Sequence, residues 1–229
     1  MRAIGVVIPA GGTGTRAERR TPKQFLRLGG EAILAHTLRH FVRHPGVRAV
    51  VIAAPPAHLT RTRAVVRRRA GGGGGGGVAV VPGGVTRQES VWRGLAALPE
   101  GLDLVLVHDA VRPFITRALI DAVADAAAAG GAAVCALPIA ETVKRVRDGV
   151  VEATLDRSVL WAVQTPQGFR VDLLREAHDK ARRDGAEATD DAMLVERLGH
   201  PVRVVLGLPG NVKITTPADL RAARETVRR

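Results

Sequence analysis

Short runs of β-branched residues alternate with amphipathic helical patterns along the whole chain of 229 residues, and this alternation limits the fold more than any other feature. The expected strands are residues 4–8, 47–53, 78–82, 103–107, 132–137 and 201–206. The expected helices are residues 32–43, 58–69, 88–98, 117–129, 171–183, 190–198 and 217–227. Strands that are apolar throughout and separated by helices predict an α/β fold, in which helices cover both faces of a mainly parallel sheet.

Two segments interrupt the alternation. Residues 71–77 are all glycine and would lose too much backbone entropy in a helix or strand, so we expect a surface loop. Within residues 138–162, Arg147-Asp148-Gly149-Val150 separates two alternating stretches and is typical of a hairpin turn. Such an insertion is expected to be a dimerisation arm, with an antiparallel extension of the sheet as a nearly equal alternative. We therefore expect one domain, residues 1–229, that carries an arm at 138–162.

The chain is strongly basic, because 34 Lys and Arg residues against 22 Asp and Glu residues give a net charge of +12. This balance is typical of proteins that bind polyanions. Residues 61–69 hold five arginines but no acidic or aromatic residue, whereas nucleic-acid binding usually combines charge with aromatic stacking. Aromatic residues make up 3% of the chain and Tyr is absent. A nucleic-acid-binding protein is therefore a remote alternative, and no nucleic-acid partner is expected.

The cysteine content and the hydropathy indicate where the protein works. The single cysteine, Cys135, lies in an apolar run and is expected to be a buried structural thiol. A chain with one cysteine forms no internal disulfide, which fits a reducing cytoplasm. No run of about 18 apolar residues is present, so no membrane-spanning helix is expected. These features predict a cytoplasmic location and no membrane partner.

The loop after the first expected strand carries the strongest chemical signal, because ligands of open α/β sheets bind beyond the carboxyl ends of the strands. This loop is Pro9-Ala10-Gly11-Gly12-Thr13-Gly14-Thr15-Arg16, and Lys23 follows it. Glycine amides can approach phosphate oxygens closely, and Arg and Lys add positive charge. The segment matches neither GxGxxG nor the Walker A pattern. It favours binding of a nucleoside triphosphate over a redox dinucleotide.

Other strand ends also carry polar residues. Asp109 follows the fourth strand, where a carboxylate needs a metal, a sugar hydroxyl or a cation such as Arg112. His108 is expected to be a packed, hydrogen-bonded residue. Gly84 lies in a turn that opens a helix and suits main-chain contacts with a base or ribose. Lys213 and the loop 164–167 are expected to complete the rim, and residues 189–191 to cap the next helix.

Together, these loops resemble the 2-C-methyl-D-erythritol 4-phosphate cytidylyltransferase family. The matching segments run in the family's order between Val6 and Asp219: PAGGTGTR, PKQFL, GGVTRQESV, HDAVRP, ETVKR, TLDRSVLW, QTPQGF, TDDAM and NVKITTPADL. The resemblance implies a Rossmann-like nucleotidyltransferase fold. It also implies that CTP and the polyol phosphate give the CDP-linked methylerythritol and pyrophosphate, in non-mevalonate isoprenoid precursor biosynthesis.

The resemblance further implies a cofactor, a partner and the roles of individual residues. The cofactor is Mg²⁺, held mainly by the CTP phosphates with Asp109 as a further candidate ligand, and the partner is a second copy whose arm reaches into the site. The implied transition-state stabilisers are Arg16 and Lys23, and the implied substrate-positioning residues are Arg157 and Lys213. The positions implied to line the polyol phosphate site are Asp109, Arg112, Thr142 and Thr165. Those implied on the nucleotide side are Ala10, Gly11, Gly12, Gly84, Ser90 and Ala110.

The implied reaction needs no general base, because the attacking phosphate oxygen is already anionic at neutral pH. Catalysis then consists of positioning and charge neutralisation. Two features depart from the family: Val85 stands where Asp is common, and residues 61–77 match nothing functional. A cytidylyltransferase for another polyol phosphate, such as ribitol 5-phosphate, would keep the same loops and is the main alternative. The ETVK and Asp-Arg elements of the arm favour methylerythritol phosphate.

Overall fold

The computed structural model describes residues 2–11, 21–70 and 77–228. Its central sheet consists of β1 (Ile4–Pro9), β4 (Val47–Ala54), β5 (Gly77–Pro82), β6 (Leu104–Val107), β7 (Ala132–Pro138), β10 (Trp161–Arg170) and β11 (Arg203–Leu206). The strand order is β11-β7-β10-β6-β1-β4-β5. Neighbouring strands are parallel, except that β10 runs antiparallel to both β6 and β7. The predicted mainly parallel sheet is confirmed.

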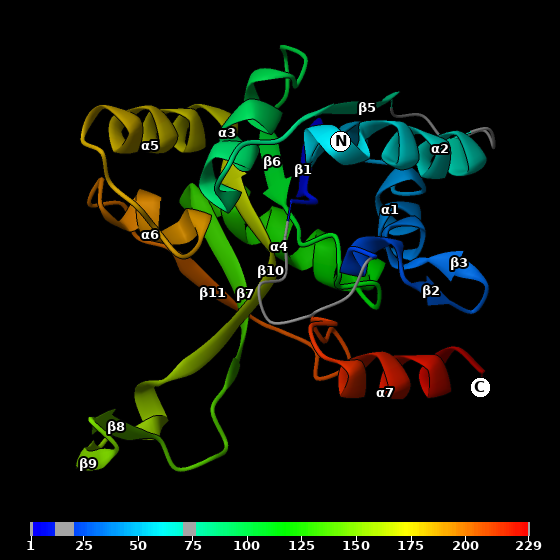
Figure 1. Cartoon of the computed structure of the whole chain (residues 1–229). Coiled ribbons are helices and arrows are strands. Elements are labelled where there is room, and N and C mark those ends of the chain that lie inside the picture. The colour runs from blue at the N-terminus through cyan, green and yellow to red at the C-terminus, as the bar shows by residue number, and fades with distance from the viewer. Residues whose placement is uncertain (1, 12–20, 71–76, 229) are drawn as a thin grey trace.

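Helices cover both faces of this sheet, as the alternation of strands and helices predicts (Figure 1). One layer contains α1 (Ile33–Val42), α2 (Leu59–Ala70) and α4 (Arg117–Gly130), and the other contains α3 (Arg87–Ala96), α5 (Val171–Arg183) and α6 (Asp191–Glu196). In β1, Ile4, Val6 and Ile8 pack into the first layer and Val7 packs into the second. Because each face is covered, every residue of β1 is buried.

Side-chain caps and a third apolar cluster fix the ends of the helices. Thr86, Thr116 and Asp190 cap α3, α4 and α6 by accepting a hydrogen bond from the backbone N–H three residues later, which satisfies a group that the helix leaves unpaired. The predicted cap at residues 189–191 is therefore confirmed. The last helix, α7 (Pro217–Arg228), packs through Leu220 against Leu28 of a small hairpin, β2 (Arg27–Leu28) and β3 (Glu31–Ala32).

Two expectations about the strands were wrong, and one short hairpin was not predicted. Residues 164–167, expected as a rim loop, belong to β10; Pro166 has no N–H for a ladder and lies where the pairing with β7 changes register, so it concealed a central strand. Gly77, expected in the glycine loop, starts β5 because its backbone pairs with Ala49 of β4. The β2–β3 hairpin was not predicted, since its strands have two residues each. The rest of the expected glycine loop, residues 71–76, lies outside the described residues.

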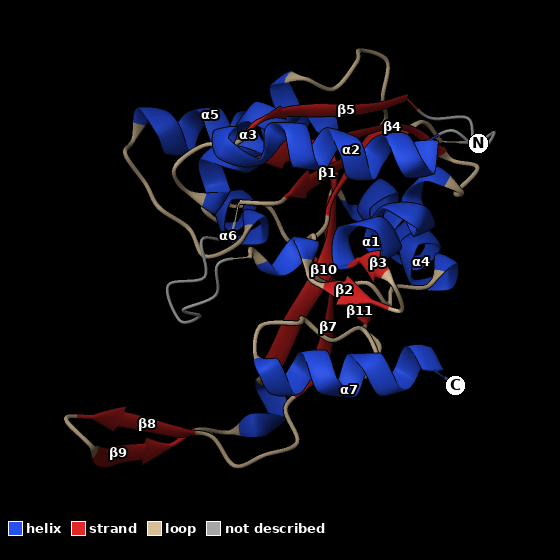
Figure 2. Cartoon of the chain, turned by 45° about the vertical axis from the view of Figure 1, so that its right-hand side comes forward, coloured by secondary structure: helices blue, strands red, loops and turns tan. Residues whose placement is uncertain are grey.

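The predicted hairpin is confirmed as a projecting arm. β8 (Lys144–Arg147) and β9 (Val150–Thr154) are joined by Asp148 and Gly149, whose positive φ angles of 50° and 81° suit the tight turn of a hairpin. They form a separate two-stranded sheet, so the alternative that they extend the central sheet is wrong. The arm extends away from the helices and the central sheet in both views (Figures 1 and 2).

Cys135 is buried, as expected, and burial raises the pKa of its thiol to about 12. The thiol is therefore neutral at pH 7, and it packs in the core of the fold. Within the described ranges, no helix has the length and apolar character needed to cross a membrane.

Shortening Val51 in β4 to alanine is expected to lower the free energy of unfolding by about 2 kcal/mol, because it removes two methyl groups from a close-packed core. Val51 is 1% exposed, whereas Val85 is 98% exposed and gives a matched Val→Ala control. Urea unfolding followed by circular dichroism measures both changes. Equal midpoints for the two variants would contradict the core assignment.

Candidate active site

A cavity of about 340 Å³ opens at the carboxyl ends of β1 and β6. It is lined by Pro9, Ala10, Gly11, Lys23, Gln24, Val85, Arg87, Asp109, Ala110, Val111, Lys213 and Thr215. Six residues predicted for the site therefore come together from four separate segments: Ala10, Gly11, Lys23, Asp109, Ala110 and Lys213. Two other predicted residues, Gly12 and Arg16, lie outside the described residues.

A hydrogen bond between the residue after Lys23 and the end of the first strand holds Lys23 at the cavity. Lys23 begins the 3-10 helix η1 (Lys23–Phe25), which follows the extended Pro22. The next residue, Gln24, is 3% exposed, and its Nε2 donates a hydrogen bond of 2.6 Å to the carbonyl of Ala10. Because a buried amide is costly to leave unpaired, this bond fixes the position of η1 beside Ala10, at the end of β1. Lys23 therefore lines the same cavity as Ala10 and Gly11.

Asp109 lies at the centre of a cluster of cations. Its Oδ2 is 2.9 Å from the Lys213 ammonium and 3.6 Å from Nε of Arg112, and its Oδ1 is 3.6 Å from Nε of Arg87. Burial by itself would raise the pKa of the Asp109 carboxyl, but Lys213, Arg87 and Arg112 outweigh burial and lower this pKa to about 2. The carboxylate is therefore charged at neutral pH, and it holds the Lys213 ammonium at the cavity.

A hydrogen-bonded layer supports Asp109 from behind. Thr165 Oγ1 accepts a hydrogen bond from the Asp109 backbone N–H at 3.0 Å and lies 3.1 Å from Nδ1 of His108. Burial lowers the pKa of His108 to about 4, so its ring is neutral at pH 7 and, as predicted, packed and hydrogen-bonded. Arg112 donates from Nη1 to the carbonyl of Asn211 at 2.7 Å. Thr165 and Arg112 thus lie in this layer and are absent from the cavity lining.

The glycine turn before α3 is shaped by Ser90. Its hydroxyl accepts a hydrogen bond from the Gly84 N–H at 3.0 Å and donates to the carbonyl of Thr86 at 2.9 Å. A Cβ atom on Gly84 would lie 2.3 Å from the Glu89 side chain, so this close turn needs glycine. The adjacent Val85 lines the cavity with a fully exposed side chain, and nothing in the structure explains why valine occurs there.

Arg87 is a cavity residue that the sequence analysis did not identify. It is the first residue of α3 and donates from Nη1 to Oδ2 of Asp191 at 2.7 Å. The TDD motif indicated a helix cap there, but the pattern did not show that Asp191 is buried against a residue about one hundred positions earlier. Only the packing of α6 against the sheet brings the two side chains together.

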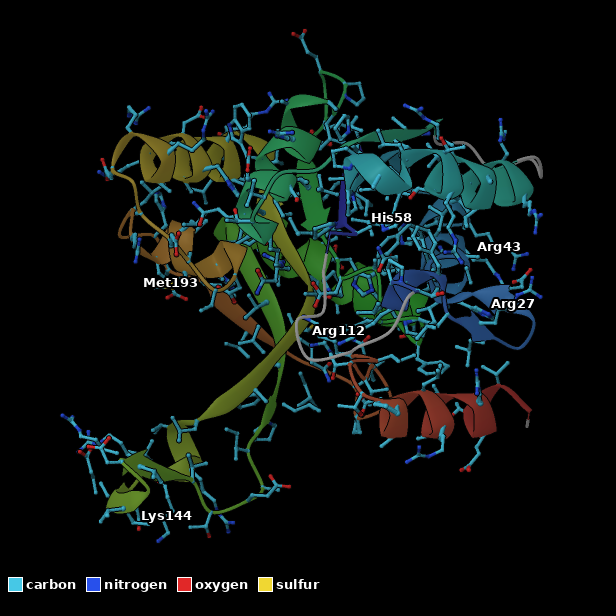
Figure 3. The ribbon with its side chains drawn as sticks, viewed as in Figure 1. Arg27, Arg43, His58, Arg112, Lys144 and Met193 are labelled. Carbon is cyan, nitrogen blue, oxygen red and sulfur yellow. The ribbon has the colours of Figure 1, made fainter. Side chains whose placement is uncertain are left out.

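Two predicted residues on the arm do not reach the cavity of their own chain. Thr142 and Arg157 are exposed, and the Arg157 guanidinium donates to the carbonyl of Ala140 within the arm. Figure 3 shows Lys144 far out on the arm, whereas Arg112 lies at the centre of the molecule. A single chain therefore leaves its cavity without these two side chains.

Candidate metal ligands can be sought only among the residues that the structure describes. No group of three or more His, Cys, Asp or Glu side chains is placed to hold a metal within residues 2–11, 21–70 and 77–228. Both oxygens of Asp109 face cations, which compete with a metal ion for the carboxylate. In this structure the Asp109 carboxylate is therefore occupied by cationic side chains.

Comparisons with known proteins agree on one family. The family model of 2-C-methyl-D-erythritol 4-phosphate cytidylyltransferase matches residues 4–229. A 2-C-methyl-D-erythritol 4-phosphate cytidylyltransferase from Symbiobacterium thermophilum is 48% identical over 221 residues, which cover 96% of this chain and 91% of the relative. The structure of the Thermus thermophilus enzyme of the same name is 40% identical, covers 100% of both chains and gives a TM-score of 0.80. A 4-diphosphocytidyl-2C-methyl-D-erythritol synthase from Anaerococcus prevotii is 28% identical, with a TM-score of 0.87 and coverage of 100% of this chain and 99% of that chain.

Proposed function

Because the chain belongs to the 2-C-methyl-D-erythritol 4-phosphate cytidylyltransferase family, we propose that it transfers a cytidylyl group from CTP to 2-C-methyl-D-erythritol 4-phosphate. The products are 4-diphosphocytidyl-2-C-methyl-D-erythritol and pyrophosphate, in non-mevalonate isoprenoid precursor biosynthesis. The observation that carries this proposal is the cavity in which Lys23, Lys213 and the end of β1 meet. It presents two ammonium groups to a pair of phosphorylated substrates.

The chemical step is an attack of one anion on another. An oxygen of the polyol phosphate forms a bond to the α-phosphorus of CTP, and the bond from that phosphorus to the pyrophosphate oxygen breaks. The barrier falls when positive charge neutralises the α-phosphate and the leaving pyrophosphate. We assign this neutralisation to Lys23 and Arg16. Lys213 lines the same cavity beside Asp109 and would hold the incoming phosphate.

The nucleotide side of the cavity is assigned to the ends of β1 and β6 and to the turn before α3. Ala10, Gly11 and Ala110 line the cavity with small side chains, so main-chain groups can approach the nucleotide closely. Gly12 belongs to the same loop by sequence. Gly84 and Ser90 would shape the turn that faces the base or ribose. Asp109 would line the polyol phosphate side, and Thr165 and Arg112 would support it from behind.

We further propose that Mg²⁺ enters with CTP, on whose phosphates it would neutralise charge. The cations around Asp109 and the absence of a ligand cluster in the described ranges both favour this arrangement over a resident protein site. The proposed cytoplasmic location and the expected lack of a nucleic-acid partner remain predictions.

A homodimer would complete the site. Thr142 and Arg157 project on the arm, and apolar side chains that a single chain leaves exposed lie on or beside it: Val146, Val150, Val151, Val159, Trp161 and Val163. Exposed apolar side chains that gather on one element are typical of a protein interface. We propose that the arm, residues 138–162, packs on a second copy and places Arg157 and Thr142 at the partner's polyol phosphate site.

Replacing Lys213 with alanine is expected to raise KM for methylerythritol phosphate by about tenfold or more, as for the loss of a charged hydrogen bond, with a smaller change in KM for CTP. Steady-state kinetics with each substrate varied in turn give the two values. A Lys180→Ala variant, which removes an exposed lysine paired with Asp184 on α5, is the control. An unchanged KM for the polyol phosphate would remove Lys213 from the proposed role.

Substrate selection tests the proposed function. The protein is incubated with Mg²⁺, each of the four nucleoside triphosphates and either methylerythritol phosphate or ribitol 5-phosphate, and pyrophosphate is measured. Release that requires CTP together with methylerythritol phosphate is expected. Faster release with ribitol 5-phosphate would favour the alternative acceptor, and no release with any pair would contradict a cytidylyltransferase.

A further inference from the structure

A buried carboxylate outside the proposed catalytic set lies behind the cavity. Asp191 is 1% exposed, yet its carboxylate has two side-chain partners: Oδ2 accepts from Arg87 at 2.7 Å, and Oδ1 lies 3.0 Å from Nε2 of His178. Its backbone N–H donates to Oε1 of the buried Gln167 at 3.1 Å. A buried carboxylate with this many partners is held in one place.

Arg87 connects this carboxylate to the cavity. Its Nη1 contacts Asp191, and its Nε lies 3.6 Å from Oδ1 of Asp109. Asp109 in turn holds the ammonium of Lys213 at 2.9 Å through its other oxygen. The four side chains therefore alternate in charge, from the buried Asp191 to the half-exposed Lys213.

In the proposed reaction, two anionic groups interact with the ammonium of Lys213: the Asp109 carboxylate and the polyol phosphate. In this structure its ammonium neutralises Asp109, but in the proposed reaction it holds the phosphate of the polyol. When Lys213 shares its charge with that phosphate, Asp109 loses part of its nearest counter-charge in a site where an uncompensated carboxylate is costly. Arg112 lies on the same oxygen as Lys213 and is also bonded to Asn211, whereas Arg87 faces the other oxygen.

We propose that Asp191 and Arg87 are positioning residues for the polyol phosphate: Asp191 fixes the Arg87 guanidinium, and Arg87 keeps Asp109 in place while Lys213 engages the substrate. This inference rests on the proposed function. It predicts that the effect of Asp191 on substrate use passes through Arg87, although Asp191 lies outside the cavity lining.

A double-mutant cycle tests this dependence. Asp191→Asn, Arg87→Met and the double variant are compared for KM and kcat at saturating CTP, and for thermal midpoint. Each single change is expected to raise KM for methylerythritol phosphate by about tenfold, with kcat and KM for CTP changed less, because one charged contact is lost. The double variant is expected to be no worse than Arg87→Met, since the two residues act in series.

Lys180 on α5 and Asp184 directly after this helix form an exposed pair, with a distance of 2.6 Å, that gives the matched control. Lys180→Met, Asp184→Asn and their double variant should leave both KM values unchanged. If Asp191→Asn does not fold, the Arg87→Lys variant tests the inference instead. Lysine keeps the positive charge but cannot contact Asp191 and Asp109 through two separate nitrogens, so an intermediate rise in KM for the polyol phosphate is expected.

Three outcomes would overturn the inference: multiplicative effects of Asp191→Asn and Arg87→Met on KM for the polyol phosphate, equal rises in both KM values, or a lower thermal midpoint with unchanged kinetics. An unchanged KM for the polyol phosphate in Arg87→Lys would also overturn the inference. A wild-type protein that releases no pyrophosphate would instead overturn the proposed function, so the two failures are distinguishable.

Discussion

Replacing Lys23 with alanine is expected to lower kcat by about two orders of magnitude or more, as for the loss of one donor that stabilises a transition state. Lys23 lines the cavity, and the bond from Gln24 to Ala10 fixes the short helix that carries it. Its ammonium would face charge that develops on the α-phosphate and the leaving pyrophosphate. The substitution should therefore lower kcat more than it changes KM for CTP. Initial-rate assays of pyrophosphate release at saturating substrates measure kcat.

The fold should survive this change, because Lys23 lines a cavity and its side chain is not part of the buried core. A thermal midpoint close to that of the wild type is the expected control, and Lys180→Ala should keep full turnover. Near-normal kcat in Lys23→Ala would remove this lysine from the catalytic role. Arg16→Ala is expected to behave in the same way.

Producing the Lys23→Ala and Arg157→Ala chains together is expected to restore part of the activity that each variant alone has lost. In the proposed dimer, each site combines Lys23 of one chain with Arg157 of the other. A mixed dimer of Lys23→Ala and Arg157→Ala then contains one intact site and one doubly altered site. Random pairing of the two chains would return about a quarter of the wild-type activity at low polyol phosphate. Assays of co-expressed, doubly tagged protein measure this recovery.

The geometry behind this expectation is that the arm projects away from the central sheet of its own chain (Figures 1 and 2), whereas the cavity opens at the carboxyl ends of β1 and β6. The same experiment with Lys23→Ala and Lys213→Ala is the matched control for complementation between chains. In a mixed dimer of these two variants no site is intact, because Lys23 and Lys213 line the cavity of the same chain and each cavity therefore carries one of the two changes. No recovery of activity is expected from this control. Activity that stays at the sum of the parents in the Arg157 mixture would place Arg157 in its own chain's site or outside any site.

Much of the fold follows from local patterns in the sequence. The apolar runs that become β1, β4, β6 and β7 are buried on both faces, so their composition identifies them without knowledge of their neighbours. The turn at Asp148-Gly149 is equally local, since it requires positive φ angles at both residues. In contrast, β10 lies between two core strands but contains Pro166, and only its pairing on both sides shows that it is a strand.

The residues of the site also fall into two groups: those that local sequence patterns indicate and those that only the packing of the fold brings together. Gly11, Lys23, Asp109 and Lys213 follow strands or lie near strand ends, and the topology brings them to one edge of the sheet. The contact from Arg87 to Asp191 joins two helices on the second face, and no local spacing predicts it. Sequence motifs therefore indicate which groups face the ligand, whereas the buried partners that hold those groups depend on packing between distant segments.

The central claim is tested most directly by identifying the product. The protein is incubated with CTP, methylerythritol phosphate and Mg²⁺, and the reaction is followed by phosphorus nuclear magnetic resonance. Our account predicts two coupled resonances of a diphosphate diester that grow together with pyrophosphate in equal amounts. Formation of CMP with pyrophosphate, or CTP that stays unchanged beside intact methylerythritol phosphate, would contradict it.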